Sequence, residues 1–162
     1  MLTPEQIADI RPKLVLIQTI AAALIIGVVV FAAVIFAIVD WGNLNDRLKM
    51  LSLIGAVTGI FMFGLSIVAP KIFASGRDAA PPADSDQSNA IKPILESLMA
   101  ENLIRFALIE AAIFLNLMVF MIESHRAALV VVGIGILLML ICFPRQSKMI
   151  TTIEDRMGVP LA

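Results

Sequence analysis

Four long apolar runs dominate the sequence, and the third of them contains a carboxylate, Glu110. The runs are Leu14–Val39, Met50–Ala69, Leu103–Ile122 and Ala127–Phe143. A helix needs roughly 17–25 apolar residues to cross the hydrocarbon core of a bilayer, which is about 30 Å thick. Because 60% of the 162 residues are hydrophobic and most of them are gathered in these runs, the sequence predicts an all-α, polytopic membrane protein. We expect four transmembrane helices in two antiparallel hairpins, with short amphipathic helices beside them.

The basic residues are unevenly divided between the two sides of this arrangement. The side with both termini and the middle segment carries nine Lys and Arg residues, whereas the opposite side carries only Arg47, Lys49 and Arg126. Loops rich in Lys and Arg stay in the cytoplasm. We therefore expect a protein integral to the inner (cytoplasmic) membrane, with the lipid bilayer as a partner and with N- and C-termini in the cytoplasm.

The polar stretches divide the chain into five segments. A Thr-x-x-Gln capping box at Thr3 predicts an interfacial N-terminal helix over 1–11, and Pro12 is expected to break or bend the path from it into the first crossing. The first transmembrane hairpin covers 12–69, and a cytoplasmic linker covers 70–102. The second hairpin covers 103–143, and a polar cytoplasmic tail covers 144–162.

The linker contains one segment with helical periodicity. Residues 79–89 have the composition of a flexible linker. After them, apolar residues recur at helical spacing: Ile91, Ile94, Leu95, Leu98 and Met99. This pattern predicts an amphipathic helix that either lies on the membrane or continues into the third crossing. In the first case, residues 91–102 offer a docking surface for a cytoplasmic partner.

Glu110 is the residue that most needs an explanation. It lies roughly 10 Å along the helix from Leu103, at about 1.5 Å per residue, and an ionisable group at such depth costs at least ~2.5–3.5 kcal/mol. Arg105 points about 140° away around the helix, so we expect it to pair with Glu101 instead. Without a cation, burial favours the neutral carboxyl of Glu110, which we expect to bond Gln18 at matching depth.

Two interpretations of Glu110 are open. It is either a reversible proton or sodium site, or a protonated or paired side chain that fixes the register of packed helices. An alignment of the two hairpins as an internal repeat places Gln18 over Glu110 and Lys13 over Arg105. In the first interpretation Gln18 is a second ion ligand, and the two basic residues support the site.

Small and polar residues mark expected helix contacts. Gly55 and Gly59 form a GxxxG motif that Gly64 and Ser52 extend, which predicts close helix packing. The partner helix belongs either to the same chain or to another subunit. Asn116 in the third run predicts a second, hydrogen-bonded contact.

The sequence has none of the motifs that carry enzyme chemistry. Phosphate-binding Gly loops, nucleophile elbows and paired carboxylates are absent, and His125 is a lone loop histidine, expected to be solvated. Cys142, the single cysteine, lies in an apolar run where a structural role is expected. We expect no catalytic residue, metal site, cofactor or nucleic-acid partner.

The stretch Phe106-Ala-Leu-Ile-Glu-Ala-Ala-Ile-Phe114 resembles the Ala-Leu-x-Glu-Ala segment of the rotary ATP synthase proteolipid, the c subunit. The resemblance covers about twenty residues of the 162. It implies that Glu110 carries an ion. The same pattern is similar to uncharacterised small bacterial four-helix membrane proteins that share this carboxylate helix.

Three functions follow from these features. The first is a non-enzymatic structural or assembly subunit that packs through transmembrane helix faces, as a homo-oligomer. The second is a proton- or sodium-translocating, proteolipid-like subunit that uses Glu110. The third is an accessory subunit that binds a cytoplasmic partner through residues 91–102.

Overall fold

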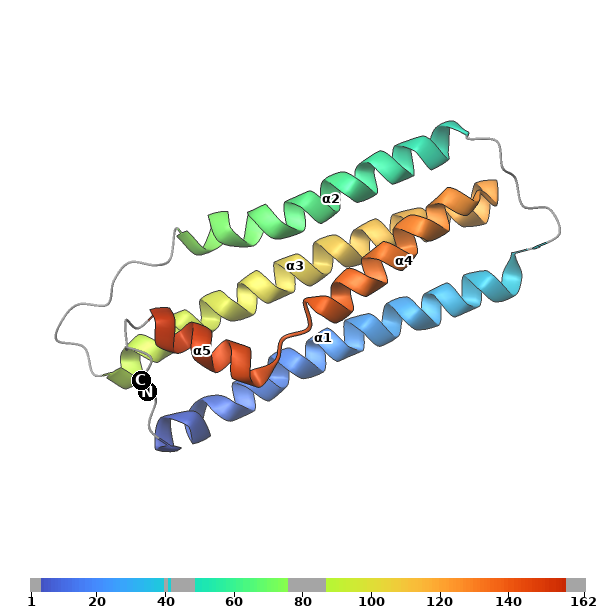
Figure 1. Cartoon of the computed structure of the whole chain (residues 1–162). Helices are drawn as coiled ribbons and strands as arrows, with labels where there is room; N and C mark the ends of the chain where they lie inside the picture. The colour runs from blue at the N-terminus through green and yellow to red at the C-terminus, as the bar shows by residue number, and fades with distance from the viewer. Residues whose placement is uncertain (1–3, 40, 42–48, 76–86, 157–162) are drawn as a thin grey trace.

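The chain forms five α-helices in the residues that the structure, a computed structural model, describes: 4–39, 41, 49–75 and 87–156 (Figure 1). The helices are α1 (Pro4–Ile38), α2 (Met50–Ser75), α3 (Gln87–Glu123), α4 (Arg126–Ile141) and α5 (Gln146–Arg156). No strand occurs in these ranges, which confirms the predicted all-α class. Thr3 of the capping box, the linker over 76–86 and the end of the tail over 157–162 lie outside the described residues.

Three helical segments are long and apolar enough to cross a membrane: Ile10–Ile38, Met50–Pro70 and Ile91–Glu123. The fourth apolar run is divided. α4 has 16 residues, and a bend of 66° separates it from α5. If this bent pair counts as one span, the chain has four candidate crossings. By length and composition, these helices could span a membrane.

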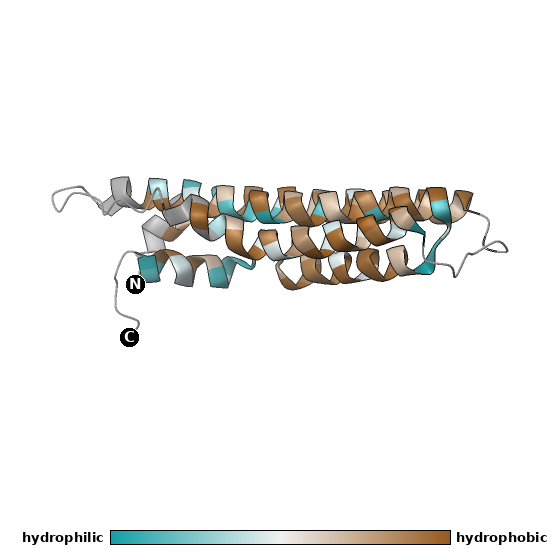
Figure 2. Cartoon of the chain, turned by 90° about the horizontal axis from the view of Figure 1, so that it is seen from above, coloured by the Kyte–Doolittle hydropathy of each residue, from teal (hydrophilic) through white to brown (hydrophobic). Residues whose placement is uncertain are grey.

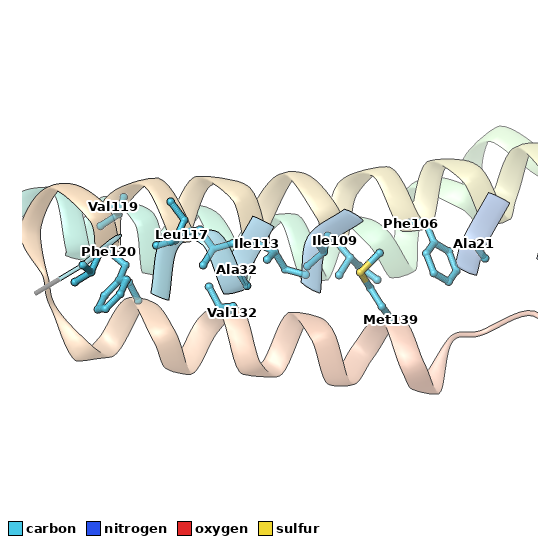
Figure 3. Close-up of a cluster of buried hydrophobic side chains, with 14 residues drawn as sticks. Ala21, Ala32, Phe106, Ile109, Ile113, Leu117, Val119, Phe120, Val132 and Met139 are labelled. Carbon is cyan, nitrogen blue, oxygen red and sulfur yellow. The ribbon is translucent and has the colours of Figure 1, made fainter. Parts of the chain in front are cut away.

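α3 is the central helix and packs against the other four. One of its faces, with Phe106, Ile109 and Ile113, is buried in a cluster with α1 and α4 (Figure 3). A second face, with Asn116, lies against α2. In the described ranges α1 and α2 make no contact, so the first predicted hairpin is not a packed pair. Because α3 offers each of them a separate face, α1 and α2 lie on opposite sides of the bundle (Figure 1).

Hydrophilic residues are frequent at the end of the bundle that holds α5, and most residues along α4 and the helices beside it are hydrophobic (Figure 2). In α3 the first exposed large hydrophobic side chain is Leu103 and the last is Ile122. Their separation along the helix is about 28 Å, close to the ~30 Å hydrocarbon core. We call the part of the bundle at this depth the apolar belt.

A second buried apolar cluster lies beyond the apolar belt, where the N-terminal parts of α1 and α3 meet α5. We call it the collar, and its buried members are Ile10, Leu14, Ile17, Ile91, Leu95, Leu98, Met149 and Ile153. At the polar edge of the collar, the Arg156 guanidinium of α5 donates to Glu101 Oε1 of α3 at 2.7 Å and so links these two helices. The amphipathic segment over 91–102 therefore continues into the third crossing, and its apolar face is covered within the chain.

Two predicted segment boundaries differ from the structure. Pro12 does not end a separate helix over 1–11, because α1 continues through it. Proline lacks the N–H that would bond the Ala8 carbonyl, and Ala8 is exposed, so water can satisfy that group. The segment over 144–162 is more than a polar tail, because Met149 and Ile153 are one helical turn apart and both are buried in the collar.

Candidate functional site: an unpaired carboxylate in the apolar belt

Glu110 lies on the side of α3 that faces α1. On the same stripe of α3, Leu103 and Phe106 lie seven and four residues before Glu110, and Phe114 lies four residues after it. Leu103 and Phe106 line a pocket together with α1 residues. The ring of Phe114 packs edge-on against Phe31 of α1, with 4.9 Å between centroids. Glu110 therefore lies at the seam between α1 and α3, inside the apolar belt.

The α1 side of this seam is open at the depth of Glu110. α1 and α3 run in the same direction (Figure 1), and the Phe31–Phe114 contact sets an offset of 83 in residue number between them. The same offset places Gly27 opposite Glu110. Gly27 is exposed, and a Cβ atom added to it would meet nothing within 4 Å. No side chain of α1 fills the space at this point.

Glu110 has no polar partner in the part of the chain that the structure describes. Its side chain is half-buried, and no hydrogen bond or ion pair involves its carboxylate there. Asn116, an uncharged polar residue of the same apolar run, is fully buried and donates two hydrogen bonds through Nδ2. Its Oδ1, however, is buried without a hydrogen-bond partner, so only the amide nitrogen is satisfied, whereas no atom of the Glu110 carboxylate has a partner there.

Gln18, predicted to bond Glu110, has other partners. Its Nε2 donates to the Pro144 carbonyl at 2.9 Å, and its Oε1 accepts from Gln146 Nε2 at 3.0 Å. Both polar atoms of the Gln18 amide are therefore taken by the bend between α4 and α5, and the predicted pair with Glu110 is wrong. Lys13 is exposed on α1, one turn further from the belt than Ile17 of the collar.

Arg105 does not pair with Glu101, contrary to the prediction. Glu101 is bound by Arg156, and Arg105 Nε donates to the backbone carbonyl of Ser66 in α2 at 3.4 Å. That carbonyl is the one that Pro70, inside α2, leaves without an intrahelical donor. Arg105 supplies a donor to this carbonyl, and α2 continues through Pro70 to Ser75, beyond the predicted boundary.

An apolar pocket of about 100 Å³ lies on the same seam, at the polar edge of the apolar belt. Its lining comes from both helices: Ile17, Ile20, Ala21, Leu24, Met99, Ala100, Asn102, Leu103 and Phe106. Phe106 is one helical turn from Glu110. The seam therefore combines an apolar hollow and an unpaired carboxylate within one turn of α3.

The GxxxG motif is used inside the chain. A Cβ atom on Gly55 would lie 3.1 Å from Asn116 Oδ1, and one on Gly59 would lie 2.9 Å from Asn116 Nδ2. The same Nδ2 donates to the Gly55 carbonyl at 3.1 Å. Gly64 is exposed, and an added Cβ would meet nothing within 4 Å, so this residue does not extend the contact. The close approach of α2 and α3 thus depends on two glycines and one asparagine.

Two polar residues at the far end of the belt have roles that the sequence did not reveal. Glu123, at the end of α3, accepts hydrogen bonds from the hydroxyl and from the N–H (2.8 Å) of Ser52 in the first turn of α2. A carboxylate at a helix N-terminus satisfies orphan N–H groups and complements the helix dipole. His125, predicted to be solvated, is buried and caps α4 by accepting from the Ala127 N–H at 3.2 Å. In the sequence, only their positions next to helix ends could have indicated these capping roles.

Comparisons with protein families, with curated proteins and with solved structures find no match. Within the described ranges, no group of three or more His, Cys, Asp or Glu side chains could hold a metal ion. Function is therefore inferred from the site itself.

Proposed function

We propose that the chain is a non-enzymatic integral membrane subunit that assembles with copies of itself through a transmembrane face containing Glu110. The observation that carries this proposal is the missing partner of Glu110 in the described part of the chain. A carboxylate in the apolar belt costs at least ~2.5–3.5 kcal/mol unless another polar group meets it. A neighbouring chain that supplies a donor or acceptor removes part of that cost.

Assembly through α2 has less support. The two glycines of the GxxxG motif, Gly55 and Gly59, lie against α3 and α4 of their own chain. The small residues of α2 are therefore already used for folding. The α1–α3 seam, by contrast, combines an open position at Gly27 with the unpaired Glu110.

The proposed topology has four crossings, with both termini on the cytoplasmic side of the inner membrane. In it, α4 and the bent segment before α5 together make the fourth crossing. The exposed basic residues of the collar end support this orientation: Arg11, Lys13, Lys92, Arg145 and Lys148. Positive residues remain on the cytoplasmic side during insertion.

Substitution of Glu110 tests the proposal. Glu110→Leu removes the polar contact, and we expect a smaller assembly, because interhelical hydrogen bonds in membranes contribute about 0.6–2 kcal/mol each. Thr19→Leu is the matched control, since Thr19 is exposed on α1 and its hydroxyl bonds its own helix at the Val15 carbonyl. The measurement is the native mass of each detergent-solubilised protein. A monomeric wild type, or a Glu110→Leu variant that assembles like the wild type, would contradict the proposal.

The alternative is an ion-translocating subunit in which Glu110 binds and releases a proton or sodium ion. The half-buried position of the carboxylate favours this candidate, because an ion carrier must be reachable. Gln18 is not part of that site, since both its amide atoms are bound elsewhere. Carbodiimide labelling separates the two functions for sodium, because a sodium carrier is protected from the reagent by sodium, whereas an assembly contact is not. For protons, the test is proton uptake by proteoliposomes that contain the Glu110→Gln variant. Uptake is lost relative to the wild type only if Glu110 is a carrier.

Docking of a cytoplasmic partner on residues 91–102 is not proposed. The apolar side chains of that segment, Ile91, Leu95 and Leu98, are buried in the collar by α1 and α5.

A further inference from the structure

Small exposed residues of α1 and α3 lie at about the depth of Glu110. Ala107 and Ala111 stand on the exposed side of α3, three residues before and one residue after the carboxylate. The helix offset places Ala23 and Gly27 of α1 within one residue of the depth of these two alanines, and both are exposed. We call these four residues and Glu110 the seam patch. Residues this small let another backbone approach closely in a membrane.

Two copies of one chain insert in the same orientation, because the basic residues are concentrated at the same end of each. A closed pair is then related by a two-fold axis along the membrane normal. Such an axis leaves the depth of every residue unchanged, so a residue near the axis meets its own counterpart. Glu110 is the one acidic residue of the third apolar run, and it lies in the seam patch.

We infer that the seam patch is a homodimer interface in which the two Glu110 side chains meet across the two-fold axis and hydrogen-bond as a carboxyl pair. This inference rests on the proposed function and names the partner group. One carboxyl is protonated and donates its O–H to an oxygen of the other, which accepts. The pair supplies the hydrogen-bond partner that Glu110 lacks, because the same carboxyl group is present at the same depth in the second copy.

The pocket on the seam agrees with this placement. It lies one turn from Glu110 toward the polar edge, and its lining is apolar apart from Asn102. Leu103 at its rim is 52% exposed. Because depth is conserved in the dimer, the exposed Leu103 side chain of each copy stands at the level of the other copy's pocket.

Disulfide trapping tests which face forms the interface. Three single cysteines are compared in a Cys142→Ser background: Ala107→Cys in the seam patch, Val57→Cys on the exposed side of α2 and Ile134→Cys on the exposed side of α4. A disulfide needs Cα atoms within about 7 Å, so we expect a trapped dimer for Ala107→Cys alone. A trapped dimer only at Val57 or Ile134 overturns the seam patch but leaves self-assembly standing. A dimeric native mass with no trapping at any site also overturns it. A monomeric native mass overturns the proposed function itself.

Charge exchange tests the Glu110 pair. Glu110→Leu is expected to weaken dimerisation by about 3- to 30-fold, the range for one interhelical hydrogen bond. Glu110→Gln keeps it, because two amides also pair. Glu110→Lys alone should be monomeric, whereas co-expression with the wild type should yield a mixed dimer that joins a cation to a carboxylate. If wild type and Glu110→Lys do not mix although each is inserted and folded, Glu110 contacts some other group and the pair is refuted.

Discussion

Gly59→Ala tests the packing of α2 against α3 and α4 at a single atom. A Cβ added to Gly59 would lie 2.7 Å from Val131 Cγ1 and 2.9 Å from Asn116 Nδ2. Both distances are shorter than real Cβ contacts, so one neighbour has to move. Val131 is β-branched and stiff at χ1. Asn116 is held by its hydrogen bond to the Gly55 carbonyl at 3.1 Å. Displacing either side chain therefore costs free energy.

The magnitude follows from two opposing effects. Overpacking costs about 1–3 kcal/mol, and replacing a helical glycine by alanine returns up to about 1 kcal/mol. Gly64→Ala is the matched control, because it lies on the same helix and its added Cβ would meet nothing within 4 Å. The helix-propensity gain is common to both variants and cancels in their difference. We therefore expect Gly59→Ala to be less stable than Gly64→Ala by about 1–3 kcal/mol.

The assay is unfolding by SDS in mixed micelles, followed by the fluorescence of the single tryptophan, Trp41. The Trp41 ring lies 5.6 Å from Phe36 and 6.0 Å from Phe120, so its emission reports on the packing of α1 against α3. Helical circular dichroism in parallel detects partial unfolding. Equal unfolding free energies for the two variants would refute the close contact of Gly59.

Two further predictions concern the helix cap and the topology. Glu123→Ala leaves the N–H and hydroxyl of Ser52 without their acceptor, and loss of such a cap should cost about 1–2 kcal/mol in the same SDS assay; an unchanged midpoint would show that the cap contributes nothing. Reporters fused after Ala162 or inserted within 80–89 should both report cytoplasm, and a periplasmic signal from either would exclude four crossings.

Much of the fold class could be predicted from hydrophobic run length. Leu103–Ile122 was identified as one apolar run, and the exposed hydrophobic surface of α3 has the same bounds. This agreement has a physical cause, because the lipid acts on every exposed residue and so imposes its thickness directly on the sequence. The helical spacing of Ile91, Leu95 and Leu98 likewise predicted a helix, although not which helices cover it.

The candidate site was predictable in one respect only. An isolated carboxylate in an apolar run is visible without coordinates, so Glu110 was found. Its partners were not, because intrahelical geometry and repeat alignment cannot say which helices are neighbours. Gln18 and Arg105 were both assigned to the wrong groups for this reason, and each instead bonds a backbone carbonyl on another segment.

The sequence by itself determined that the chain has helices long and apolar enough to span a membrane, with an ionisable group inside one of them, since the transfer of side chains from water to hydrocarbon depends on residue type and run length alone. Only the tertiary structure decided which helices are neighbours. It placed α3 at the centre, used Gly55 and Gly59 within the chain and left Glu110 at an open seam with α1. Lipid and protein interior are equally apolar, so hydrophobicity cannot distinguish a lipid-facing side from a packed one. Steric fit and hydrogen-bond geometry make that distinction, and they exist only once the helices are assembled.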